Sequence, residues 1–194
     1  MNETTPDSTL PSSDAVAALL RGRRTTHDFL PERIADDVVE RAIEVGSWAP
    51  NHHRTEPWRF YLLGTLARKQ IIERNAQLVR AAQGERAAEV KRQRWLEVPG
   101  WLLMTCLHND DVMREREDYA ACCCAAQNMM LTLWADGVGT KWTTGAITRD
   151  PELFHMLGVH AAREFVVGLF WYGRPASVTT QQRRPLAQVL ARIE

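Results

Sequence analysis

The chain has 194 residues, a length that suits one domain, and 45% of them are hydrophobic. Its 24 basic and 24 acidic residues cancel, which excludes a global attraction to nucleic acid or to an anionic membrane. The N-terminal segment lacks the apolar core of a secretory signal, and the longest apolar tract, 119–135, is shorter than a membrane span. We therefore expect a soluble, cytoplasmic protein.

The first part of the chain predicts a polar lead-in and two helices. Residues 1–13 lack periodicity and are expected to be disordered, followed by a single domain over 14–194. Asp14 is expected to cap a helix that ends near Gly22, and a second helix is expected to start at about Asp36.

Strands and helices then alternate. The apolar runs 58–63, 101–107 and 164–172 are typical of buried strands. The charged stretch between the first two is predicted to be helical and split at Gly84, and the segment 114–136 is the strongest predicted helix, buried on nearly every face of its second half. Asp150 as cap, Pro151 at the first position and Gly158 just past the end indicate a further short helix. This order predicts an α+β or three-layer α/β domain.

No metal site is expected. Cys122, Cys123 and Cys124 are consecutive, so on a helix they point about 100° apart and cannot close around one ion. With Cys106 they are predicted to be small buried side chains in a reducing compartment. His52 and His53 are adjacent, and no third ligand follows at a useful spacing.

Three short motifs carry the chemistry. Arg23-Arg24-Thr25 offers two guanidinium groups and a hydroxyl, which suit a phosphate, although a solvated helix end is the other interpretation. The loop 49–58 reads A-P-N-H-x-x-x-x-P-W, and its two prolines stiffen it. The segment 137–145 contains G-x-G-x-x-W-T-T-G after a helix, which excludes a dinucleotide-binding glycine motif because that motif follows a strand.

In order and spacing these motifs resemble the FMN-dependent nitroreductase family, in particular its short, YdjA-like single-domain members, over about residues 18–175. The resemblance implies a three-layer α/β/α sandwich with a mixed, mainly antiparallel central sheet flanked by helices. It also implies a homodimer that shares flavin sites across its interface. Glu56 stands where the family often has glutamine.

On the same resemblance we expect hydride transfer from NAD(P)H through flavin N5 to a nitroaromatic, quinone or similar small acceptor, with no side chain acting as acid, base or nucleophile. A flavin-binding protein without turnover and a dimeric scaffold without cofactor are the alternatives. Trp142 could instead be a structural residue of the core. Arg174 could reach the FMN phosphate from the other subunit, and the sequence does not decide this. The expected FMN contacts are Arg23, Arg24, Thr25, Trp48, His52, Trp142, Thr143, Thr144 and Arg174.

Overall fold

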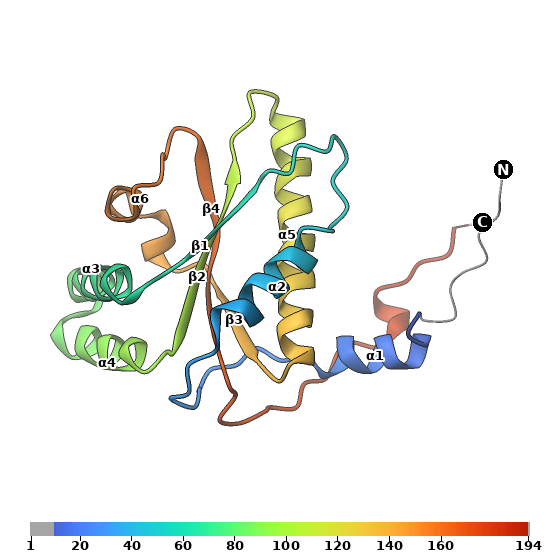
Figure 1. Ribbon diagram of the computed structural model, residues 1–194, viewed down its shortest axis with the longest axis horizontal. Helices are drawn as coiled ribbons and strands as arrows, with labels where there is room; N and C mark the ends of the chain where they lie inside the picture. Colours follow the sequence, from blue (N-terminus) through green and yellow to red (C-terminus); the bar gives the residue numbers. More distant parts are fainter. Residues whose placement is uncertain (1–9, 194) are drawn as a thin grey trace.

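The computed structural model describes residues 10–193 (Figure 1). Most of the predicted lead-in, residues 1–9, lies outside the described residues. The first helix, α1 (Ser13–Gly22), starts two residues earlier than expected. Its cap is Ser12 and not Asp14, because Ser12 has an extended backbone and its hydroxyl accepts the N–H of Ala15 at 3.2 Å.

A four-stranded sheet forms the centre of the molecule, in the order β1-β2-β4-β3, and each neighbouring pair is antiparallel. Strands β2 and β4 lie in the middle and are buried along most of their length. The predicted α+β class is confirmed. The strands are β1 (Trp58–Leu62), β2 (Gly100–Leu107), β3 (Gly139–Thr143) and β4 (Glu164–Gly173).

Two strands differ from the expectation. β1 was predicted to be buried, but it is an edge strand in which only Trp58 is buried, because a single neighbour covers it on one side. β3 was not predicted as a strand at all. Its sequence has no apolar alternation, and it is held by backbone pairing with β4.

Helices cover both faces of the sheet (Figure 1). One core lies between the sheet and the helices α2 and α5, and the other lies between the sheet and α3, α4 and α6. Gly84, with φ of +88°, separates α3 from α4, and α6 has the predicted cap, because Asp150 accepts the N–H of Glu152. The helices are α2 (Asp36–Gly46), α3 (Thr65–Gln83), α4 (Glu85–Leu96), α5 (Val112–Ala135) and α6 (Pro151–Leu157).

Helix α5 is buried on one side only. Met129 and Leu133 are buried against the sheet and α2, whereas Cys124 is exposed on the opposite side. The expectation of burial on nearly every face is therefore wrong for the single chain, as is the expectation that all four cysteines are buried. Gly137, with φ of +72°, ends the helix as predicted.

Helix α1 and the tail 177–193 project from the body (Figure 1). Helix α1 has no buried residue, and residues 177–193 are exposed. The tail runs beside α1 in the figure, and Arg24 joins the two segments by donating to the carbonyl oxygen of Thr179 at 3.1 Å. Among the described residues, no helix combines the length and the apolar character that crossing a bilayer requires.

Candidate functional site

The arginine motif lies where α1 meets the sheet. The backbone N–H of Arg23 donates to the carbonyl oxygen of Leu19 at 3.1 Å and closes the last turn of α1. Thr25 forms a parallel bridge with Thr140 of β3, and the N–H of Thr26 donates to the carbonyl oxygen of Thr140 at 2.9 Å. Main-chain hydrogen bonds therefore fix the motif at the β3 edge of the sheet.

A cavity of about 590 Å³ opens beside this motif. Burial, and then the charges of Arg24 and Arg183, lower the pKa of Arg23. Within the described part of the chain, the Arg23 side chain has neither a hydrogen-bond acceptor nor an ion-pair partner. A cavity of this size and charge suits an anionic ligand. It is lined by Leu20, Arg21, Arg23, Arg24, Gln127, Gln181 and Arg183.

The two arginines of the motif are not equivalent. Arg24 donates to the carbonyl oxygens of Arg23, at 2.9 Å, and of Thr179, at 3.1 Å, as well as to that of Arg21. Its guanidinium group is thereby occupied by the backbone of its own chain. Arg23 keeps its donors available, so it is the better candidate for binding an anion.

The second motif forms a loop beside the N-terminal half of α5. Trp48 is 80% exposed, and its indole N–H donates to Glu44 at 2.8 Å. His52 is also exposed. Its ring stacks on His53 with 4.2 Å between ring centres, and its Nδ1 lies 3.4 Å from the carboxylate of Glu117. Both predicted contacts therefore present their rings at the surface of the single chain.

A buried carboxylate holds this loop in an unfavourable conformation. Arg54 and Glu56 have φ values of 52° and 45°, a region that is costly for residues other than glycine. Asn51 accepts the backbone N–H of Glu56 at 2.8 Å, and Thr55 donates to Asp118, which is 3% exposed. Sequence reasoning missed Asp118; the available signal was a single acidic residue where the apolar half of a helix begins.

The same loop contains three potential metal ligands. The sequence offered no third ligand for His52 and His53, but the fold supplies one in Glu117, and one ligand atom from each of the three lies within 4.8 Å of the others. The two imidazole planes differ by only 6° and the rings are stacked, so their in-plane lone pairs lie in separate, nearly parallel planes and do not converge on one point. We therefore propose no metal at this position.

The third motif forms β3 and the turn after it. The indole N–H of Trp142 donates to the carbonyl oxygen of Val167 at 3.0 Å, and a Cβ on Gly168 would come within 2.0 Å of that nitrogen. Trp142 therefore packs closely on the sheet, as expected for the core residue that was the alternative interpretation of its sequence position. Thr143 is half-buried and Thr144 is exposed at the end of the strand.

Arg174 is engaged within its own chain. It donates to the carbonyl oxygen of Asp136, just past the end of α5, and its Nε lies 3.8 Å from a carboxylate oxygen of Glu32. A basic group at this position stabilises the C-terminal end of a helix. The contacts within the chain give Arg174 a structural role.

The predicted residues do not all lie in one place. Arg23 and Arg24 line the cavity together with Gln127 of α5, and Arg174 donates to the carbonyl oxygen of Asp136 just past the end of that helix. His52 lies beside Glu117 in the N-terminal half of the same helix. Ten helical residues separate Glu117 from Gln127, or about 15 Å. One chain therefore does not bring His52 to the arginine-lined cavity.

Comparison with known proteins identifies the chain. Residues 20–174 match the Nitroreductase family over their whole length. The chain belongs to the nitroreductase family. The Arg23 motif and the loop around His52 both lie within the matched region, whereas Gln181 and Arg183, which also line the cavity, follow it in the chain.

Individual relatives agree with this assignment. YfhC of Bacillus subtilis, named for NAD(P)H nitroreductase activity, is 29% identical over 152 residues, 76% of this chain and 78% of the relative. YdjA of Escherichia coli K12, named likewise, is 26% identical over 81% of this chain and 86% of its own. A crystal structure of a Desulfovibrio desulfuricans nitroreductase in complex with FMN has a TM-score of 0.74 at 25% identity, covering 94% of this chain and 99% of the other.

We predict that Asp118→Ala lowers the free energy of unfolding by about 1–3 kcal/mol and loosens the loop 51–56, because Thr55 and Asn51 lose a buried charged acceptor. Urea denaturation and amide hydrogen exchange of the loop measure the two effects. Glu117→Ala is the matched control, since Glu117 contacts only the exposed histidine rings at this position. Equal exchange rates in both variants would show that Asp118 does not hold the loop.

Proposed function

We propose that this chain is a cytoplasmic, FMN-dependent NAD(P)H oxidoreductase whose electron acceptor is a nitroaromatic, a quinone or a similar small molecule. The observation that carries the proposal is the arginine-lined cavity beside Arg23, whose cationic side chain has no counter-ion among residues 10–193, at the position of the family's flavin motif. The named activity of two relatives and the FMN complex of a third support it. All four cysteines are free, in line with a reducing compartment.

The residues of the cavity fit the phosphate of FMN. A phosphate monoester carries close to two negative charges, and arginine binds it with a planar pair of donors. Arg23 and Arg183 would supply this charge, and the Thr25 hydroxyl would add a neutral hydrogen bond. Arg24 would act indirectly, because it ties the tail that carries Arg183 to the end of α1.

The end of β3 would hold the ring system. Bound FMN supplies the redox chemistry, since it accepts a hydride from NAD(P)H and passes electrons on to the acceptor. Thr143 and Thr144 would contribute backbone groups and hydroxyls along the ring, and Trp142, packed on Gly168, keeps that strand end in place. The chain's contribution is orientation, so no side chain of this group needs to act as an acid or base.

We further propose that the protein is a homodimer and that Trp48 and His52 complete the flavin site of the second copy. Three observations support this. His52 and the arginine-lined cavity lie beside positions of α5 that are about 15 Å apart. Helix α1 buries none of its residues against its own chain. From Ala120 onward the outward side of α5 is apolar or uncharged, with Ala120 and Cys124 exposed and Leu131 half-buried, which suits a contact between two copies of the chain.

We expect the protein to purify yellow and to lose its colour with NADH or NADPH under anaerobic conditions. Arg23→Ala should weaken FMN binding by about 10- to 150-fold, the loss expected for a charge-assisted hydrogen bond. Fluorescence titration of the apoprotein with FMN measures this, with Arg86→Ala on α4 as the control. Full FMN occupancy of Arg23→Ala at dilute concentration contradicts the phosphate assignment. A yellow protein that neither nucleotide bleaches would indicate flavin storage.

We expect Cys124→Arg to disrupt the dimer and to leave flavin-free or aggregated protein, while Cys124→Ser stays dimeric and yellow. Two arginines brought together across a two-fold interface repel each other and lose their hydration. Light scattering combined with size exclusion measures the mass. Met130, on the same helix, is unsuitable because it is buried in its own chain, at 6% exposure. A soluble, flavin-loaded monomer of Cys124→Arg would eliminate the shared site.

We expect His52→Ala to lower FMN affinity far more than it lowers the rate of flavin reduction at saturating FMN, because the histidine would position the cofactor and take no part in proton transfer. Anaerobic stopped-flow absorbance measures the rate, and His53→Ala is the neighbouring control. A thousand-fold slower reduction in fully loaded His52→Ala protein would assign a chemical role to this side chain.

A further inference from the structure

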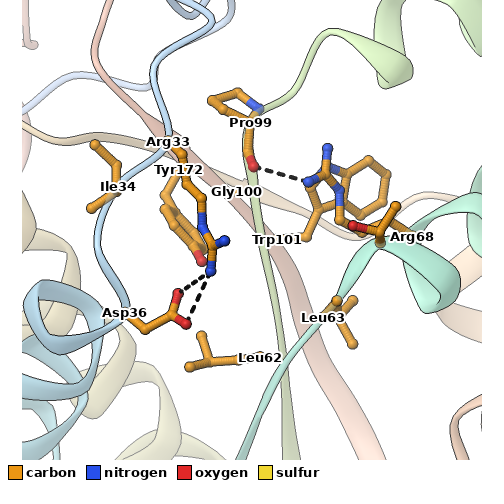
Figure 2. Close-up of a pocket in the computed structure, with 12 residues that line it drawn as sticks. Arg33, Ile34, Asp36, Leu62, Leu63, Arg68, Pro99, Gly100, Trp101 and Tyr172 are labelled. Carbon is orange, nitrogen blue, oxygen red and sulfur yellow. Dashed lines mark hydrogen bonds and ion pairs between the residues drawn. The ribbon is translucent and has the colours of Figure 1, made fainter.

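A second cavity, of about 330 Å³, lies between the starts of α2 and α3, the start of β2 and the end of β4 (Figure 2). None of its lining residues belongs to the proposed flavin site. Figure 2 shows Arg33, Asp36 and Tyr172 on one side and Arg68 with Trp101 on the other. Its polar groups come from two arginines, one carboxylate, one phenol and the first turn of a helix.

Arg68 brings a partly desolvated positive charge to this cavity. Burial lowers the pKa of its guanidinium group. The group donates to the carbonyl oxygens of Pro99, at 3.0 Å, and Val98, and it lies 6.0 Å from the ring centre of Trp101. Its Nε is buried without a hydrogen bond, and no carboxylate of the described residues pairs with it. The charge of Arg68 is therefore held rigidly but not neutralised.

The start of α3 adds unpaired backbone donors. Its cap is Gly64, which has no side chain to accept a hydrogen bond, and its first turn contains no acidic residue. The first N–H with a helical partner is that of Arg68, which donates to Gly64 at 3.0 Å. The N–H groups of Thr65, Leu66 and Ala67 have no acceptor in the described chain. They lie at the positive end of a 19-residue helix.

Tyr172 supplies an independent indication of a ligand. Only 7% of this residue is exposed, yet its hydroxyl makes no hydrogen bond among the described residues, and the side chain lines the cavity. The ring is buried, whereas the hydroxyl faces the cavity, where it can donate to a ligand. Gly100 leaves room for the ring, because a Cβ at that position would come within 2.2 Å of it. The sequence thus makes space for a phenol ring whose hydroxyl has no acceptor among the described residues.

The remaining charges at the rim cancel. Arg33 donates to both carboxylate oxygens of Asp36 at 3.1 Å, and both side chains are more than half exposed. The pair contributes no net charge, so Arg68 and the helix start make the cavity positive. With a volume of about 330 Å³, the cavity is larger than a chloride ion requires.

We propose that this cavity binds a phosphate-type oxyanion, either inorganic phosphate or the phosphate of a small monoester. Tyr172 donates its hydroxyl, the first turn of α3 donates backbone N–H groups, and Arg68 supplies the charge. The oxyanion provides acceptors for donors that otherwise have none. This site is separate from the flavin cavity and does not depend on the chain being an oxidoreductase.

Titration of the FMN-saturated protein with inorganic phosphate, at constant ionic strength against chloride, tests the proposal. Two-dimensional amide NMR should show saturable shifts of Thr65, Leu66 and Ala67 that chloride does not produce. Tyr172→Phe should weaken phosphate binding at least ten-fold without lowering stability, because the hydroxyl it removes makes no bond in the chain. Tyr61→Phe is the matched control, since the Tyr61 hydroxyl donates to Glu164 outside the cavity.

A second titration with glycerol phosphate identifies the source of the anion. Binding at least three-fold tighter than that of inorganic phosphate assigns the cavity to a monoester, and equal binding assigns it to the free ion. Arg68→Gln should abolish both. The proposal is overturned if neither compound shifts the first turn of α3, if chloride shifts it equally, or if Tyr172→Phe binds phosphate as tightly as Tyr61→Phe does.

Discussion

The antiparallel pairing of β2 with β4 is the constraint on which the rest of the structure depends. Both strands are buried on both faces, with Leu102 and Phe170 facing one core and Trp101 and Trp171 facing the other. A sheet that is apolar on both faces requires helices on both sides, which produces the three layers. Charged chemistry is excluded from these cores. The arginine-lined cavity therefore lies at the β3 edge of the sheet, and the second cavity lies at the ends of the middle strands.

Features that depend on neighbouring residues in the chain could be predicted from the sequence, and features that depend on distant neighbours could not. The cap of α6 and the end of α5 at Gly137 were predicted, because capping uses residues within a few positions of each other. The edge position of β1 and the existence of β3 were missed, since both follow from which strand lies beside them. The burial of the outer side of α5 was overestimated, because burial also depends on which elements pack against the helix.

In the candidate site, too, local features could be predicted and long-range contacts could not. The chemistry of arginine toward phosphate is intrinsic to the side chain, so the motif at Arg23 could be recognised in the sequence. Which arginine is already engaged could not be recognised, because the partners of Arg24 and Arg174 are backbone carbonyls supplied by the fold. Asp118 holds a loop more than sixty positions before it in the sequence, and Glu117 approaches two histidines from a different element.

The hydrogen bond from Arg24 to Thr179 joins positions 155 residues apart. Closing a flexible loop of that length costs about 4–5 kcal/mol of chain entropy, whereas one hydrogen bond returns about 1 kcal/mol. The contact can therefore form only after the sheet and its helices have already brought the two ends near each other. The wall of the arginine-lined cavity that contains Gln181 and Arg183 is consequently ordered only after the core has formed, so the cavity is completed later than the sheet and helices on which it stands.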